Sequence, residues 1–145
     1  MLIVHLGAAV VLLGASTHNA ITLAGILRGR TNLAGREKTY AAVAFYAFVV
    51  CFVIGTLIYP AFRWYVRAKY FDASLPWASG LFEIKEHLIS LAFAVGLGQY
   101  FLSRYVDLEK YREFRPLYAF FTFTFWAVAV YAAVSGALLV ILRSI

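Results

Sequence analysis

The chain has 145 residues, of which 63% are hydrophobic and 14% are charged, and its formal net charge is +6. A soluble domain has a charged fraction of about 25%, so this composition excludes an ordinary soluble protein and indicates an integral membrane protein in contact with a lipid bilayer. The basic residues lie at the ends of apolar stretches, and for this reason we expect no nucleic-acid partner.

Four apolar stretches are long enough to cross a bilayer, which takes about 20 residues of α-helix. They cover approximately residues 3–27, 40–60, 75–103 and 117–142, with short connections between them. We therefore predict an all-α integral membrane protein in which four transmembrane helices form an up-down bundle, as a single domain over residues 1–145.

The first stretch carries a row of small residues on one side. At 100° per residue, Gly7, Gly14, His18 and Gly25 fall within roughly 20° of one line. Small residues let helix backbones approach closely in lipid, so the row predicts a helix-packing seam. The same groove makes His18 a candidate cofactor ligand. No positive charge precedes the stretch, and we therefore expect a retained helix rather than a cleaved signal peptide.

Two other reactive side chains are interpreted as structural. His5 lies about 160° around the first helix from the glycine row and close to the membrane surface, where a histidine can reach water. Cys51 is the only cysteine and lies in the middle of the second stretch, so a disulfide within the chain is excluded. We expect an interfacial role for His5 and a small buried apolar role for Cys51.

The connection after the second stretch predicts a polar cluster. A proline at position 60 bends or ends the helix, and if the helix continues, Arg63 and Arg67 share one face. Glu83 and Glu86 lie near the start of the third helix on the same side of the membrane, where the helix dipole favours negative charge. We predict that these four residues meet at the outer mouth of the bundle. They either hold the connection in place or form an entry site for a substrate, a quinone or a proton.

The third stretch is unusual because it opens with ionisable residues. Each such group near mid-membrane costs at least ~2.5–3.5 kcal/mol, so these residues usually face a bundle interior. Gly80, Glu83, His87, Ala94 and Gly98 fall within about 40° of one line. This face predicts a second packing seam through its two glycines, and it makes His87 a second candidate cofactor ligand.

The last connection and the distribution of charge predict the orientation. Residues 104–115 alternate apolar and charged side chains, which predicts an amphipathic helical extension. Eight of the 13 lysine and arginine residues fall in the first and third connections. By the positive-inside rule these connections face the cytoplasm, so both termini lie outside it. A bacterial inner membrane is the expected location.

The leading functional interpretation is a non-catalytic anchor or assembly subunit of a larger membrane complex. Because no soluble domain is apparent, its expected partners are other membrane subunits or further copies of itself. No nucleophile lies beside a base and no metal-ligand spacing occurs, so no catalytic or metal-binding residue is predicted. The chain is not expected to act as an enzyme on its own.

Two alternatives remain open. The first is a haem b or quinone-binding electron-transfer protein, with His18 and His87 as cofactor ligands. Against a shared haem, His18 lies ten residues from Arg28 whereas His87 lies seventeen from Arg104, a difference in depth of roughly 10 Å. The second alternative is a proton-coupled transporter or channel component, which the intramembrane Glu, Lys and His side chains favour.

Overall fold

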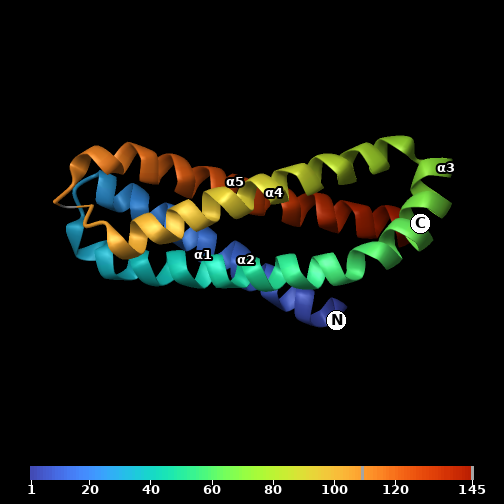
Figure 1. Ribbon diagram of the computed structural model, residues 1–145, viewed down its shortest axis with the longest axis horizontal. Helices are drawn as coiled ribbons and strands as arrows, with labels where there is room; N and C mark the ends of the chain where they lie inside the picture. Colours follow the sequence, from blue (N-terminus) through green and yellow to red (C-terminus); the bar gives the residue numbers. More distant parts are fainter. Residues whose placement is uncertain (109, 145) are drawn as a thin grey trace.

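The computed structural model describes residues 1–108 and 110–144, and nearly all of them are helical (Figure 1). The four long helices are α1 (Leu2–Leu27), α2 (Ala34–Phe62), α4 (Pro76–Tyr105) and α5 (Arg115–Ser144). No β-strand occurs in the described ranges. The predicted all-α fold with four long helices is therefore confirmed.

The helices form a four-membered ring in which each helix packs on the next one along the chain. α1 contacts α2 and α5, and α4 contacts α2 and α5. Both chain termini lie at the same end as the connection between α2 and α4, and the other two connections lie at the opposite end (Figure 1). We call the end with connections 28–33 and 106–114 the closed end, and the end with the termini the open end. α2 and α4 diverge towards the open end (Figure 1).

Three helical segments are long and apolar enough to cross a membrane, namely Leu2–Leu27, Ala34–Ser74 and Arg112–Arg143. α4 has 30 residues, which is sufficient length, but charged and polar side chains interrupt its apolar sequence. The third predicted span, 75–103, thus matches α4 in position and length and is less apolar than the other three.

The connection between α2 and α4 is helical almost throughout. α2 does not end at Pro60 but passes into a π-helical segment, η2 (Arg63–Phe71), and then into the short α3 (Asp72–Ser74). A proline has no backbone N–H, so one hydrogen bond of the regular α-helix is missing at Pro60. The π-helical segment that follows has wider turns and also departs from the α-helical hydrogen-bond pattern. Leu75, with φ −141° and ψ 66°, is the one non-helical residue between η2 and the start of α4 at Pro76.

The amphipathic helix expected over residues 104–115 is wrong. α4 ends at Tyr105, Val106 is extended, and only η3 (Arg112–Phe114) is helical before α5. Local hydrogen bonds replace the helical ladder: the Lys110 amide donates to the Asp107 carboxylate at 3.3 Å, and the Arg115 Nε donates to the Leu108 carbonyl at 2.7 Å. Hydrogen bonds between side chains and the backbone compete with the backbone hydrogen bonds that a helix would form.

The apolar core lies in the middle of the bundle and is built from small residues facing aromatic rings. Ala44 and Ala92 are almost fully buried beside Phe48 and Phe125, whose ring centroids lie 5.4 Å apart in an edge-on arrangement. The alanines let α2, α4 and α5 approach closely enough for the rings to meet. A second, smaller cluster of Val66, Phe71, Ala78 and Leu139 anchors η2 at the open end.

Candidate functional site

A cavity of about 300 Å³ lies between the four helices on the open side of the apolar core. Its volume is at the lower end of the range of small-molecule sites. Most of its wall is apolar, and the side chains that carry polar nitrogen or oxygen atoms are His5, Thr56, Tyr59, Lys85, Glu86 and Ser90. The cavity therefore combines an apolar enclosure with a few polar groups from α1, α2 and α4.

Lys85 projects from α4 towards α5. A Cβ atom at Gly136 of α5 would lie 3.3 Å from the Lys85 Nζ, so the missing side chain leaves room for the ammonium group. Within residues 1–108 and 110–144, Lys85 forms no hydrogen bond and no ion pair, although Glu86 attracts it electrostatically. Its ammonium group is therefore available to a bound molecule.

His5 faces the cavity from α1. Its ring Cε1 lies 3.7 Å from the position of a Cβ at Gly55 of α2, and its Nδ1 is buried without a hydrogen-bond partner in the described chain. The Cys51 thiol of α2 also points to the His5 carbonyl at 3.9 Å. The expectation that His5 sits at the membrane surface, away from the bundle, is therefore wrong. Two glycines are the feature of the sequence that could have indicated this site. Gly55 lies on α2 beside His5, and Gly136 lies on α5 beside Lys85.

Aromatic rings form much of the remaining wall. They belong to Phe48, Phe52, Tyr59, Phe82 and Phe125. Tyr59 and Phe82 are nearly parallel, with an interplanar angle of 8° and centroids 6.1 Å apart. Flat, apolar walls of this kind favour a planar or elongated apolar ligand, with its polar atoms directed to Lys85 and His5.

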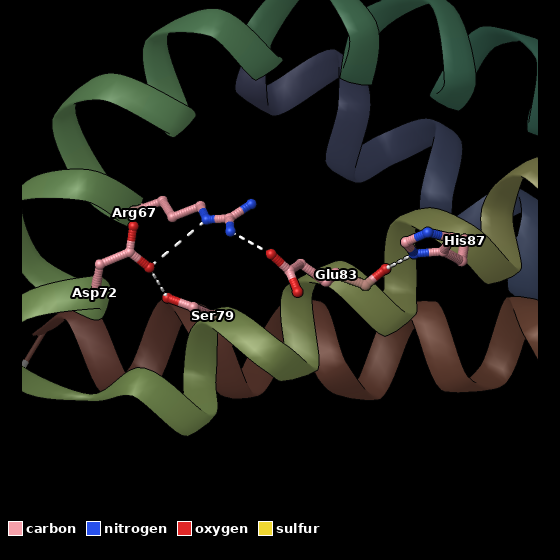
Figure 2. A network of polar contacts seen from close by, with 5 residues as sticks. All are labelled: Arg67, Asp72, Ser79, Glu83 and His87. Carbon is pink, nitrogen blue, oxygen red and sulfur yellow. Dashed lines mark hydrogen bonds and ion pairs between the residues drawn. The ribbon is translucent and has the colours of Figure 1, made fainter.

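A polar network holds the helical connection against α4 at the rim of this end. Arg67 of η2 donates a hydrogen bond to the Glu83 carboxylate, and its Nε lies 3.7 Å from Asp72 Oδ1 (Figure 2). The Ser79 hydroxyl donates to the same Asp72 carboxylate. The network thus ties η2, α3 and the start of α4 together.

The predicted cluster of Arg63, Arg67, Glu83 and Glu86 is only partly assembled. The structure brings Arg67 and Glu83 together, whereas Arg63 is exposed and Glu86 lines the cavity instead. Glu86 lies three residues beyond Glu83, which is about 4.5 Å further along α4 into the bundle. Arg67 is already engaged by two nearer carboxylates.

The two histidines predicted as cofactor ligands lie on the outer surface of the bundle. The Nδ1 of His18 donates to the Gly14 carbonyl at 2.8 Å, and that of His87 donates to the Glu83 carbonyl at 2.7 Å. Each ring is therefore directed along its own helix, as Figure 2 shows for His87. The structure does not bring the two histidines together.

The predicted packing glycines divide into two groups. A Cβ at Gly25 would lie 2.7 Å from Leu33, and one at Gly98 would lie 2.6 Å from the ring of Phe121, so both permit close contacts. A Cβ at Gly7, Gly14 or Gly80 would meet no atom of the described chain within 4 Å, so these three permit no close contact here, and their role in helix packing stays a prediction. The sequence analysis also missed a contact of the same kind at position 96, where a Cβ would lie 2.5 Å from the ring of Phe125.

A buried polar layer near the closed end also escaped the sequence analysis. Glu37 of α2 is 2% exposed, and its carboxylate accepts hydrogen bonds from the Tyr118 hydroxyl and, at 3.1 Å, from the Ser103 hydroxyl. On the same side of the core, Asn19 is fully buried and its side-chain amide has no partner among the described residues. The spacing of polar residues on α1, at 16, 19 and 22, is the signal that could have identified the buried face.

No protein-family model, curated protein or solved structure matches this chain. The function of the site is therefore inferred from its geometry.

Proposed function

We propose that this chain is an integral membrane protein with four transmembrane helices, α1, α2, α4 and α5, and that its open-end cavity binds a small, mostly apolar molecule bearing hydrogen-bond acceptor oxygens. A quinone has this chemistry. The observation that carries the proposal is a pair of nitrogen groups, Lys85 Nζ and the buried His5 Nδ1, which have no hydrogen-bond partner among the described residues and belong to a cavity of about 300 Å³ with aromatic walls.

The ionisable residues of α4 support its placement in the membrane as the fourth span. Lys85 and Glu86 are half-buried and line the cavity between the helices rather than facing outwards. Ionisable side chains within membrane spans are found in this position, where they mark ligand or ion sites. The bias of cations towards the closed end supports termini outside the cytoplasm, in a bacterial inner membrane.

Ligand binding is tested by thermal unfolding of the purified full-length chain in detergent. A short-chain quinone should raise the Tm of the wild type and should have little effect on Lys85→Met, which keeps the length of the side chain but loses the donor. Lys69→Met is the matched control, because Lys69 lies outside the cavity over the Tyr65 ring. Equal shifts in all three proteins, or no shift in the wild type, would exclude a quinone site at Lys85.

Membrane topology is tested separately by cysteine labelling in a Cys51→Ala background. Asn32 is exposed at the closed end and Lys69 is exposed at the open end. Asn32→Cys should react with an impermeant reagent only from the cytoplasmic side, and Lys69→Cys only from the outer side. The reverse pattern would invert the orientation.

A second candidate function is the anchor or assembly subunit of a larger membrane complex, and one observation favours it. Gly7 and Gly14 present a small-residue row on the outside of α1 with no contact inside the chain. Rows of this kind associate with other helices in lipid. Gly14→Leu should then lower the mass of the complex or homo-oligomer on native gels, whereas Gly80→Leu should not. An unchanged mass would remove the support for this candidate.

The remaining alternatives gain less support from the geometry. Haem b binding by His18 and His87 requires two histidines that face one ligand, and these two lie apart on the outer surface. An absorbance spectrum of the purified protein, oxidised and then reduced with dithionite, tests it, and we expect no Soret band. A proton-coupled transporter or channel component would need a polar path past the Phe48 and Phe125 rings, which close the middle of the bundle.

A further inference from the structure

At the closed end, the outer surface of α1 and α2 contains a basic pocket unrelated to the open-end cavity. Its volume is about 270 Å³. Its polar side chains are those of three arginines, a histidine, a tyrosine and a threonine: Arg28, Arg30, Arg36, His18, Tyr40 and Thr22. No acidic side chain is among its lining residues.

The turn between the two helices is built so that the arginines are held around this pocket. Gly29 has a φ of +94°, the Gly29 amide donates to the Ile26 carbonyl at 2.9 Å, and the Arg30 amide donates to the Gly25 carbonyl at 3.0 Å. This is the Schellman arrangement, which closes a helix with a glycine in the left-handed region. The carbonyls at the end of α1 are therefore occupied, and the two arginines flank a fixed glycine.

Packing reinforces the turn. A Cβ at Gly25 would lie 2.7 Å from Leu33 Cδ1 and 3.9 Å from Arg30 Cδ. The connection therefore packs closely on α1 at a position that has no side chain. The ring of His18 lies against Tyr40 of α2, with centroids 5.2 Å apart. The pocket is thus closed on two sides by contacts between α1 and α2.

The charges of the pocket are not neutralised within the chain. In the described ranges, Arg28, Arg30 and Arg36 form no ion pair with a carboxylate. The neighbouring Glu37 faces the opposite way, into the bundle, where Ser103 and Tyr118 bind it. The start of α2 has no side-chain cap, so its first amide groups and its dipole also favour an anion here.

We infer that this pocket binds the phosphate group of an anionic phospholipid. Guanidinium groups pair with phosphate oxygens through two parallel hydrogen bonds, and the Tyr40 phenol supplies a further donor. A lipid fits better than free phosphate because the pocket is also lined by Ile21, which is 65% exposed on the apolar flank of α1 and offers a surface for acyl chains. Basic pockets at the cytoplasmic end of membrane helices suit this class of ligand.

The inference is tested on the purified full-length chain in a neutral detergent, by thermal unfolding and by native mass spectrometry. Phosphatidylglycerol should raise the Tm by at least about 3 °C and should remain bound as a one-to-one adduct. Phosphatidylcholine should do neither. Inorganic phosphate at the same concentration should not reproduce the shift, because it lacks the acyl chains.

The site is located by two triple variants that remove the same charge. Arg28→Gln, Arg30→Gln and Arg36→Gln together should abolish the shift and the adduct. Arg63→Gln, Lys69→Gln and Arg143→Gln, at the open end, should retain both. Equal loss in the two variants would show a diffuse effect of net charge, and equal protection by phosphatidylcholine or by inorganic phosphate would overturn the lipid assignment. Because the lipid comparison uses the wild type, it stays decisive even if the first triple variant fails to fold.

Discussion

Two ionisable groups, one towards each end of this bundle, are treated in opposite ways. At the closed end, the Glu37 carboxylate is buried and receives hydrogen bonds from α4 and α5. At the open end, Lys85 and His5 face a cavity, and no hydrogen bond in the described chain satisfies the Lys85 ammonium or the His5 Nδ1. A satisfied buried group contributes to a fixed arrangement, whereas an unsatisfied one is costly unless something else binds it. The contrast supports a structural role for Glu37 and the proposed binding role for the cavity lined by Lys85 and His5, whereas Asn19, on the closed side of the core, is buried without a partner among the described residues.

The largest effect should come from removing the partners of Glu37. Ser103→Ala combined with Tyr118→Phe leaves the carboxylate buried with neither hydroxyl donor, and breaking such an arrangement costs about 3–5 kcal/mol. Thermal unfolding in detergent should show a Tm lower by roughly 10 °C or more. Adding Glu37→Met should restore most of the loss, because the unpaired carboxylate is then absent. If the triple variant is no more stable than the double, Glu37 is not the source of the loss.

A smaller loss is expected from overpacking. Gly98→Leu places bulk against the Phe121 ring, at a position where even a Cβ would lie 2.6 Å away. Overpacking of this kind costs typically about 1–3 kcal/mol. Gly80→Leu, on the same helix near the open end, should change the unfolding free energy by less than about 0.5 kcal/mol. Similar losses in the two variants would contradict the assignment of the packed face.

Lys85→Met should change stability in the other direction. In the absence of ligand, the substitution removes a half-buried ammonium without a hydrogen-bond partner and fills part of the cavity with an apolar side chain, so we expect a gain of about 1 kcal/mol. Thermal unfolding of the ligand-free protein measures it. A loss of stability would mean that Lys85 has a structural partner at the open end, and the contrast between the two ends would then disappear.

The smallest effect is expected at the rim of the open end. The Arg67 to Glu83 pair joins side chains that are 20% and 50% exposed, and exposed pairs contribute about 0.2–1 kcal/mol. In a double-mutant cycle of Arg67→Gln and Glu83→Gln, the coupling free energy should fall in this range. Strict additivity of the two single substitutions would show that the contact makes no contribution in solution.

The helices could be predicted from the sequence, but the faces that they bury could not. Length and hydropathy are sufficient to locate four helices, because a bilayer-length apolar stretch has few alternatives. In such a helix both the outer and the inner face are apolar, so hydropathy does not distinguish them. The row through Gly7 and Gly14 consequently appeared to be the packing face, whereas the structure buries the face that carries Asn19 and Leu23.

The candidate site was missed for a related reason. The ionisable residues that open the third stretch are unusual for a membrane span, but the glycines that make room for the site lie on helices far away in the sequence. Gly136 of α5 lies beside Lys85, and Gly55 of α2 lies beside His5. The contact between Arg67 and Glu83, by contrast, joins residues on adjoining elements, where charge and helix position are informative. The extended residue at Val106, which ends α4, has no strong sequence signal, since neither glycine nor proline is present there.

The helical connection at the open end has a mechanical consequence. The segment Ala34–Ser74 has 41 residues and would extend about 60 Å if it were straight, whereas the hydrocarbon layer of a bilayer is only about 30 Å thick. In the proposed membrane arrangement we expect part of it to run along the headgroups, and Trp64 and Tyr65, which are largely exposed, are residue types that prefer that depth. Leu75 is the only non-helical residue between η2 and α4, so the connection from this surface segment to the helix that lines the cavity is short and mostly helical. In the proposed four-span arrangement, we expect a change in the hydrophobic thickness of the membrane to act on η2 first and to reach the spacing of α2 and α4 through this short connection.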